Sequence, residues 1–472
     1  MTPPPDDDEH DCGWKAYAKH QEAKLAEVQQ KLAALEKRLL GKKSERRKSS
    51  KMPPPVSSSK SAQETKRKRE QNAALREAKL QTEVTERPVH KCEHCDSTKL
   101  ENVSNRPSVV YEYVQPHFRK RVYQRQTVRC ENGHMTTAPA PERVGEKIRY
   151  DASFIAHLVT SKCRDSIPFY RMEKAYNSIG IPISRSTMTT LFYRAAEELR
   201  PLHAAAFRMV RLSLDVHADE TSFRQQDIDK RAFVWGFVTS EVTAYRYAAT
   251  RSGGIPVEVL GDSEGRLVVD MYTGYNVVTR TGKRIRAGCL AHARRKLWDN
   301  RHYSLTETGL ELIGQIYAIE HEAKAADILG TEQHLELRKT RSRPLFARLL
   351  WWARAECRNL DPSSALAKSL RYITRNFREL GCFLRYASLP PDNNKAEAAL
   401  RRVALGRANF LFVANEQRGV DLGVLYTLVA TCQQHGIDPI AYLSDVLLRV
   451  QTHPASRVDE LLPHRWKPPN PD

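Results

Sequence analysis

The sequence predicts a multidomain α+β protein. Its 472 residues are about three times the length that one hydrophobic core usually serves. Strand-type sequence is concentrated between residues 211 and 292, whereas the segments on either side have helical periodicity. Hydrophobic residues make up 40% of the chain, and no run approaches the ~18 apolar residues of a membrane span, which excludes an integral membrane protein.

Residues 1–41 are expected to form a coiled-coil dimerisation helix. Within residues 14–40, apolar positions alternate four and three residues apart, the spacing of a helix–helix seam. A helix folded back on its own chain is the alternative. The acidic, proline-rich start lacks the basic and apolar regions of a secretory signal, so the protein is expected in the cytoplasm. Nine cysteines, mostly scattered, predict reduced thiols there rather than a disulfide framework.

Residues 42–88 are expected to form a basic, disordered linker. They are rich in Lys, Arg, Ser and Pro and cannot bury enough apolar surface to offset the entropy of ordering. The whole chain carries 76 Lys and Arg against 56 Asp and Glu, a net charge of +20, which indicates a polyanionic partner, most often nucleic acid. Beside a binding module, such a linker adds salt-dependent affinity for DNA; otherwise it is only a solvated connection.

A zinc-ribbon-like module is predicted over residues 89–147. Two close pairs of soft or borderline ligands bracket alternating β-type sequence, and tetrahedral zinc takes its ligands from two such tight turns. The predicted ligands are Cys92, Cys95, Cys130 and His134. The alternatives for the fourth ligand are His90, His94 and His117.

Residues 148–206 are expected to be helical and to contain a helix-turn-helix. An amphipathic helix is followed by a turn at Gly180 and by a second helix that Ser184 or Ser186 caps. Arg185, at the start of the second helix, could reach phosphates and base edges in a major groove. An ordinary helical hairpin is the alternative.

Residues 207–419 carry the strand-type pattern, followed by a helical insertion at about 293–390. Five strands and a short helical link are predicted, with Asp219 toward the end of the first strand and Asp270 at the end of the fourth. If these two strands are neighbours, the acids lie side by side. In the insertion, the adjacent Trp351 and Trp352 are expected to pack in a core, with contact to an unstacked base as the alternative. Two helices at 420–450 and a tail not expected to be ordered from Pro463 complete the C-terminal region, residues 420–472.

A third acid, Glu397, lies at the start of a predicted helix after a Pro-Pro-Asp-Asn-Asn sequence. Two close carboxylates repel in a partly buried site, which favours a raised pKa or a bound divalent cation. Arg401 and Arg402 follow on the same helix and could contact phosphate. Taken singly, such acids are more often helix caps or solvated charges. Asp215, four residues before Asp219 on the same strand face, is the alternative first acid.

Several motifs occur in a fixed order along the chain. They are a leucine-rich helix followed by LLGKKSE, a Cys-rich module, HADET at 217–221, VVDMYTGY at 268–275, CLAHARRKL at 289–297, PPDNNKAEAALRRVALGRANFLF at 390–412, and DPIAYLSDVLLRV with VDELLPHRW near the end. In this combination the sequence resembles the insertion sequence 66 family of bacterial DDE transposases.

The resemblance implies a ribonuclease-H-like α/β catalytic core with an Asp-Asp-Glu triad at Asp219, Asp270 and Glu397. It implies a DNA transposase that binds the terminal inverted repeats of an insertion element and catalyses Mg²⁺- or Mn²⁺-dependent 3′-end cleavage and strand transfer. Two Mg²⁺ ions held by these acids can activate the entering oxygen and stabilise the leaving one. Relatives usually close the zinc module with a second CxxC pair, whereas this chain has Cys130 and His134.

The resemblance also implies that Arg294 and Arg295, which follow the fifth strand, contact phosphate; a solvated helix face is the alternative. Double-stranded DNA, both element ends and target, is the expected partner, in the bacterial cytoplasm at the nucleoid. A homodimer or higher oligomer and small accessory proteins of the same element are further expected partners. The alternative functions are a catalytically inactive DNA-binding repressor of transposition and a ribonuclease-H-like nuclease without strand transfer.

Overall fold

The structure is a computed structural model of the chain. It describes residues 66–67, 70–71, 118–129, 135–145, 148–228, 231–280, 282–410 and 412–468. The chain divides into two compact units, residues 1–118 and 119–472, and every element named below belongs to the second. The predicted coiled coil, most of the basic linker and the four predicted zinc ligands lie outside the described residues, so these remain predictions.

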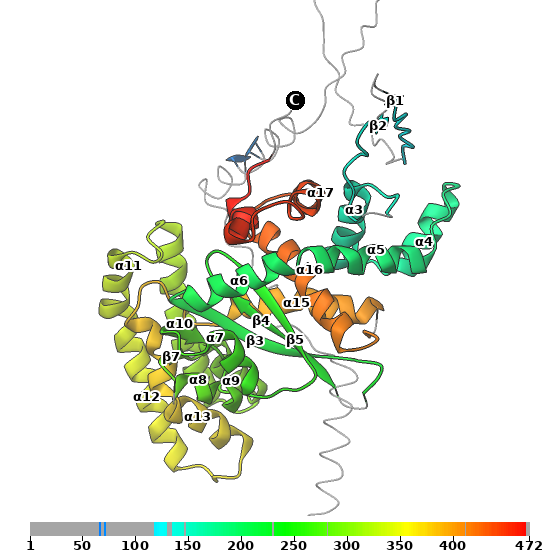
Figure 1. Cartoon of the computed structure of the whole chain (residues 1–472). Helices are drawn as coiled ribbons and strands as arrows, with labels where there is room; N and C mark the ends of the chain where they lie inside the picture. Colours follow the sequence, from blue (N-terminus) through cyan, green and yellow to red (C-terminus); the bar gives the residue numbers. More distant parts are fainter. Residues whose placement is uncertain are drawn as a thin grey trace, which may run out of the picture. The chain divides into compact units, whose positions relative to one another are not determined.

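A five-stranded mixed sheet is central to the second unit (Figure 1). Its strands are β3 (Asp215–Phe223), β4 (Ala232–Val238), β5 (Thr243–Ala248), β6 (Gly265–Val268) and β7 (Arg284–Ala287). The order is β5-β4-β3-β6-β7, in which β3, β4 and β5 are antiparallel and β6 and β7 run parallel to β3. The five predicted strands are present, and the first and fourth of them are neighbours, which the sequence left open.

Helices cover this sheet closely. β4 is buried at six of its seven positions, and such continuous burial requires cover on both faces of the sheet. α15 (Asn394–Phe410) packs on β3 and β4, and α16 (Glu416–Gln434) packs on β5. A Cβ at Gly236 would lie 3.3 Å from the Leu400 side chain, so the glycine lets α15 approach β4. The start of α15 is thereby held beside the middle of the sheet.

The segment predicted to be helical, residues 148–206, contains α3 (Ala152–Cys163), α4 (Phe169–Ser178), α5 (Arg185–Glu198) and the start of α6 (Arg200–Leu212). A short antiparallel pair, β1 (Thr127–Arg129) and β2 (Met135–Thr137), precedes it. Gly180 joins α4 to α5 with φ of 76°, a left-handed conformation that favours glycine. The Ser184 hydroxyl accepts a hydrogen bond from the Thr187 backbone N at 3.2 Å, so Ser184 caps α5. DNA binding by this helix pair remains a prediction.

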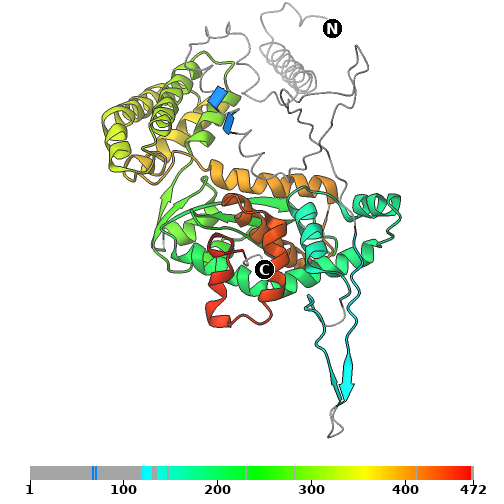
Figure 2. The same ribbon diagram turned by 90° about the horizontal axis from the view of Figure 1, so that it is seen from above.

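A helical subdomain lies between β7 and α15 in the chain, where the insertion is predicted, and stands to one side of the sheet (Figures 1 and 2). Its elements are α9 (Leu290–Asp299), α10 (Thr306–Ala325), α11 (Glu332–Leu337), the π-helical turn η3 (Arg338–Ser342), α12 (Arg343–Arg358), α13 (Ala365–Arg375), α14 (Phe377–Leu380) and η4 (Cys382–Leu384). Its hydrophobic core continues onto Val268 of β6 and Ala287 of β7. The subdomain is therefore packed on the sheet rather than tethered to it.

The remaining short elements are α7 (Gly254–Leu260), η2 (Thr273–Tyr275) and α8 (Asn276–Thr279), with α17 (Pro439–Arg449), η5 (Ala455–Leu461) and η6 (Pro463–Arg465) at the C-terminal end. The expectation that the chain is unordered from Pro463 is wrong for residues 463–468. The Trp466 ring packs edge-on against Tyr442 with centroids 5.6 Å apart, and its Nε1 donates to Asp445 at 2.7 Å. The contacts of this half-buried aromatic side chain outweigh the local preference of a proline-rich sequence.

Within the described part of the chain, no helix has the length and apolar character needed to cross a bilayer. The five cysteines that the structure describes are free.

Candidate functional site

Asp219 lies where β3 loses its parallel neighbour. It is the fifth of nine residues in β3, rather than near the end of the strand as predicted, because β3 continues to Phe223. Pairing between β3 and β6 stops at His217 opposite Val268, so β6 no longer covers this edge of β3 at Asp219. Ligands of open α/β sheets bind at such carboxyl ends of parallel strands.

Asp270 follows the neighbouring strand at the same level. Val268 pairs with His217, and the two acids each come two residues after that pair. The Tyr272 backbone N donates to Asp270 Oδ1 at 2.8 Å, which holds the carboxylate at the start of its loop. The two acids therefore follow adjacent strands, which meets the condition set from the sequence, while their catalytic role remains a prediction.

Glu397 joins them from the first turn of α15. Its backbone N donates to the Asn393 carbonyl at 3.2 Å, as in a regular helix start. Its Oε1 lies 3.5 Å from His292 Nδ1, and its Oε2 lies 3.6 Å from Arg295 Nη2. Glu397 Oε1 is buried without a hydrogen-bond partner. One oxygen of this carboxylate is therefore available to a ligand.

The three carboxylates interact electrostatically. Burial and, after it, the negative charges of Glu220, Asp270 and Glu397 together raise the pKa of Asp219 to about 7. A hydrogen bond from the Glu220 backbone N, at 2.9 Å, opposes this rise without cancelling it. A cluster of partly buried acids with this charge is stabilised by a proton or by a bound cation.

Asn393 ties the start of α15 to β3. Its Nδ2 donates to the Ala218 carbonyl at 2.8 Å, and its Oδ1 lies 3.2 Å from His217 Nδ1. Burial lowers the pKa of His217 to about 4, so the ring is neutral and its Nδ1–H donates to the amide oxygen. Asn393 thus sets the position of Glu397, one helical turn later, relative to the strand that carries Asp219. Neither His217 nor Asn393 is predicted from the sequence, although both lie inside the HADET and PPDNN motifs.

Replacing Asn393 with alanine is expected to lower the free energy of unfolding by about 1–3 kcal/mol, because the Ala218 carbonyl and His217 Nδ1 would be left buried and unpaired. Urea unfolding measures the effect. Asn394→Ala is the matched control, because Asn394 is exposed. Equal stability of the two variants would contradict this role for Asn393.

The Glu220 side chain is buried and holds the loop that follows β6. Its carboxylate accepts a hydrogen bond from the Tyr275 hydroxyl at 2.6 Å and pairs with Arg251. The Arg251 guanidinium lies 3.9 Å from the centroid of the Tyr272 ring. Gly274 is needed in this loop, because a Cβ there would come within 2.3 Å of the Tyr272 ring. The YTGY sequence is therefore a structural support for the loop that begins at the second acid.

Asp215, the alternative first acid, is already paired. Its Oδ1 accepts a hydrogen bond from Arg266 Nε on β6. Burial opposes its ionisation, but hydrogen bonds from Arg266 and Ser388 and the guanidinium charge outweigh burial, and the pKa is lowered. A carboxylate neutralised by a guanidinium is a weaker cation ligand than one facing other acids. This pairing favours Asp219 as the first acid.

The arginines predicted to contact DNA differ in exposure. Arg185 is exposed and pairs with a glutamate of α4 at 2.9 Å. Arg295 and Arg401 are also exposed. Arg294 is half-buried, and burial lowers its pKa; Arg402 is half-buried with its Nη1 enclosed. Arg185, Arg295 and Arg401 therefore present their charges to solvent more fully than the other two.

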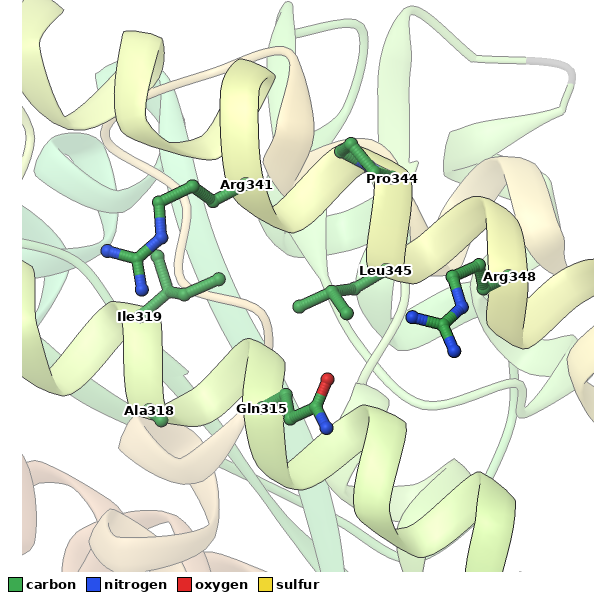
Figure 3. Close-up of a pocket in the computed structure, with 7 residues that line it drawn as sticks. All are labelled: Gln315, Ala318, Ile319, Arg341, Pro344, Leu345 and Arg348. Carbon is green, nitrogen blue, oxygen red and sulfur yellow. The ribbon is translucent and has the colours of Figure 1, made fainter.

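The two adjacent tryptophans differ in burial. Trp352 is buried in the subdomain core, as predicted, but Trp351 is 74% exposed, so core packing is wrong for it. Exposed arginines, Arg348 and Arg354, lie three residues to either side of Trp351 on α12. A hollow of about 450 Å³ lies between α10 and α12. Figure 3 shows the side chains that line it, Arg341 and Arg348 among them. None of its lining residues belongs to the acidic site.

A mixed α/β sheet with carboxylates brought together from two adjacent strands and a following helix is an arrangement whose oxygen ligands suit a divalent cation. The family model described as "Transposase IS66 family" matches residues 147–421, and that described as "IS66 C-terminal element" matches residues 427–464. The chain therefore belongs to the IS66 family of transposases.

Two curated relatives come from Sinorhizobium fredii (strain NBRC 101917 / NGR234). "Uncharacterized protein y4jD" is 30% identical over 364 residues, which cover 72% of this chain and 70% of the relative. "Uncharacterized protein y4hP" is 28% identical over 412 residues, which cover 80% of this chain and 74% of the relative. Their names assign no activity.

Proposed function

We propose that this chain is a DDE transposase that binds the terminal inverted repeats of a bacterial insertion element and catalyses Mg²⁺-dependent 3′-end cleavage and strand transfer. The observation that carries the proposal is the convergence of Asp219, Asp270 and Glu397, in a chain that belongs to a transposase family. The strand order β5-β4-β3-β6-β7, antiparallel on one side of β3 and parallel on the other, supports a ribonuclease-H-like core.

The three acids fit a divalent cation. Carboxylate oxygens are the hard ligands that Mg²⁺ prefers. The pKa of Asp219, raised to about 7 by burial and by its acidic neighbours, indicates negative charge that a cation would stabilise. Glu397 Oε1 is enclosed and lacks a hydrogen-bond partner. When bound, Mg²⁺ or Mn²⁺ would supply activation of the attacking oxygen and stabilisation of the leaving oxygen.

The residues of the chain supply positioning and charge. The backbone N of Tyr272 and of Glu220 each donate to one of the two aspartates, and Asn393 sets the position of Glu397. Arg295 lies beside Glu397 and is exposed, so its guanidinium can contact a phosphate brought to the acids. Arg401 follows Glu397 by one turn of α15 and would add a second exposed guanidinium beside that of Arg295.

End recognition is assigned to the segments before the sheet. In the α4–α5 pair, Arg185 begins the second helix and is exposed, which suits contact with phosphates or base edges of DNA. Three further parts of the proposal rest on the sequence alone. They are a structural zinc module at Cys92, Cys95, Cys130 and His134, a dimerising helix, and the accessory proteins of the element. The net charge of +20 favours a DNA partner for the whole chain.

The test uses the full-length chain and linear DNA that carries the inverted repeats flanking its reading frame. With Mg²⁺ we expect strand cleavage at the repeat ends and covalent joining to a target. With EDTA we expect the chain to bind the DNA without cleaving it. Binding with no cleavage in either Mg²⁺ or Mn²⁺ would favour a repressor instead. Cleavage that never yields joined products, even when pre-cleaved ends are supplied, would favour a nuclease without strand transfer.

A further inference from the structure

The first turns of α9 and α15 bring together a second set of possible ligands. Cys289 precedes α9, His292 lies in the first turn of α9, and Glu397 lies in the first turn of α15. The Leu290 backbone N donates to the Pro391 carbonyl at 2.8 Å, which holds the two helix starts together. One ligand atom from each of Cys289, His292 and Glu397 lies within 4.8 Å of the other two.

Two of these atoms are buried without a hydrogen-bond partner. They are His292 Nδ1 and Glu397 Oε1, and they lie 3.5 Å apart. At this distance they form at most a weak ion pair, and only if the ring is protonated, so neither atom is satisfied by a hydrogen bond and both can bind a ligand. Cys289 is fully buried beside them. The feature is therefore a convergence of sulfur, nitrogen and oxygen donors rather than a single cysteine or an acidic cluster.

The donor set selects the kind of ion. Mg²⁺ takes oxygen ligands, whereas Zn²⁺ and its analogues bind cysteine sulfur, histidine nitrogen and carboxylate oxygen together. Ligand atoms around one tetrahedral zinc ion lie about 3–4 Å apart. The three separations must therefore close by at most about 1 Å, which rotation of the side chains can provide. Three protein ligands leave a fourth position for water, as in zinc sites that exchange ligands.

The backbone around the thiol already suits a bound thiolate. The Asn393 backbone N donates to Cys289 Sγ at 3.2 Å, and such a hydrogen bond orients and stabilises a sulfur ligand. In the metal-free chain, burial raises the pKa of this thiol to about 12, so the sulfur is protonated. Binding of the ion forms the sulfur–metal bond and releases this proton to solvent.

We propose that Cys289, His292 and Glu397 form a binding site for a thiophilic divalent cation of the zinc type, and that its occupation inhibits the Mg²⁺-dependent reaction. The site shares Glu397 with the proposed acidic triad, so a zinc-type ion held by the cysteine and the histidine withdraws that carboxylate from Asp219 and Asp270. The inhibition rests on the proposed function, whereas the binding of the ion does not.

Cobalt binding to the full-length, metal-free chain tests the site directly. Co²⁺ bound to a thiolate gives a sulfur-to-cobalt charge-transfer absorption, and the wild type should bind one more equivalent with this absorption than Cys289→Ser. His292→Asn should retain the absorption but bind this equivalent at least about 10-fold more weakly. Cys382→Ser is the matched control, because Cys382 is also a fully buried free thiol. Its titration should match that of the wild type.

Thermal unfolding of each variant shows whether it folds. If Cys289→Ser does not fold, His292→Asn still tests the site. Equal Co²⁺ stoichiometry and affinity for the wild type, Cys289→Ser and His292→Asn would overturn the site. For the inhibition, micromolar Zn²⁺ added to a Mg²⁺ cleavage reaction should slow the wild type more strongly than Cys289→Ser, and equal slowing would overturn it. Co²⁺ binding at the site by a chain that never cleaves DNA would refute the proposed function while leaving the site intact.

Discussion

Replacing Asp219 with asparagine is expected to lower the rate of DNA cleavage by about 10³-fold or more and, at the same time, to stabilise the metal-free chain. Loss of activity follows because one ligand of the proposed cation site is removed, and such sites supply several kcal/mol of transition-state stabilisation. DNA binding should be preserved, because the exposed arginines are unchanged. Asp270→Asn and Glu397→Gln should lose activity to a similar extent.

The gain in stability follows from the raised pKa of Asp219. Its ordinary value is 3.8 and burial, with the neighbouring acids, raises it to about 7 in the folded chain. Between these two values the folded state binds more protons than the unfolded state, so the free energy of unfolding falls as pH rises from about 4 to about 7. Asparagine removes the buried charge. At pH 8 in EDTA, Asp219→Asn should be more stable than the wild type by up to about 4 kcal/mol.

Asp215→Asn is the matched control, because it alters the same strand with the opposite expected sign. Arg266 and Ser388 lower the pKa of Asp215, despite its burial, so its charged form stabilises the folded chain above the unfolded pKa. Urea unfolding in EDTA at pH 5 and pH 8 should show a gain for Asp219→Asn that grows with pH and a loss for Asp215→Asn. A wild type that gains stability relative to Asp219→Asn between these pH values would contradict the buried-acid interpretation.

The sheet and its acids could be predicted because their signals are local. Alternating apolar residues identify the strands, and adjacent parallel strands carry Asp219 and Asp270 to the same level. The interlock of Asn393 with His217 could not be predicted, since it joins residues far apart in sequence whose polar side chains resemble solvated ones. The prediction of an unordered tail from Pro463 was wrong for the same reason, because Trp466 is held by contacts with Tyr442 and Asp445, earlier in the chain.

Arg338 is another residue whose contacts could not be predicted from the sequence, and its replacement is expected to have a large effect on stability. It lies in the basic run RKTRSR, inside the predicted helical insertion, and no sequence pattern singles it out. The structure instead buries Arg338 to 1% exposure, with Nε and Nη2 donating to Glu320 at 2.7 and 2.6 Å. Its Nη1 donates to the carbonyls of Phe383 and Tyr386, at 2.9 and 3.0 Å. One side chain therefore joins α10, η3 and the segment that leads back to α15.

Replacing Arg338 with methionine is expected to lower the free energy of unfolding by about 3–5 kcal/mol, because Glu320 would be left as a buried carboxylate without its guanidinium. Arg341→Met is the matched control. Arg341 lies on η3 like Arg338, and it pairs with Glu322 on α10, the helix that carries Glu320. Both side chains of this second pair are about half exposed, so the unfolding transition of Arg341→Met should match that of the wild type within error. Urea unfolding of both variants at pH 7 makes the comparison.

The double variant Arg338→Met/Glu320→Met separates the buried charge from the lost hydrogen bonds. Removing the carboxylate should recover part of the stability, since a buried ion pair can often be replaced by apolar residues of similar volume. Recovery should be incomplete, because the carbonyls of Phe383 and Tyr386 would still lack their donor. If the double variant were no more stable than Arg338→Met, the stranded charge would not be the cause of the loss, and Arg338 would act mainly through those carbonyls.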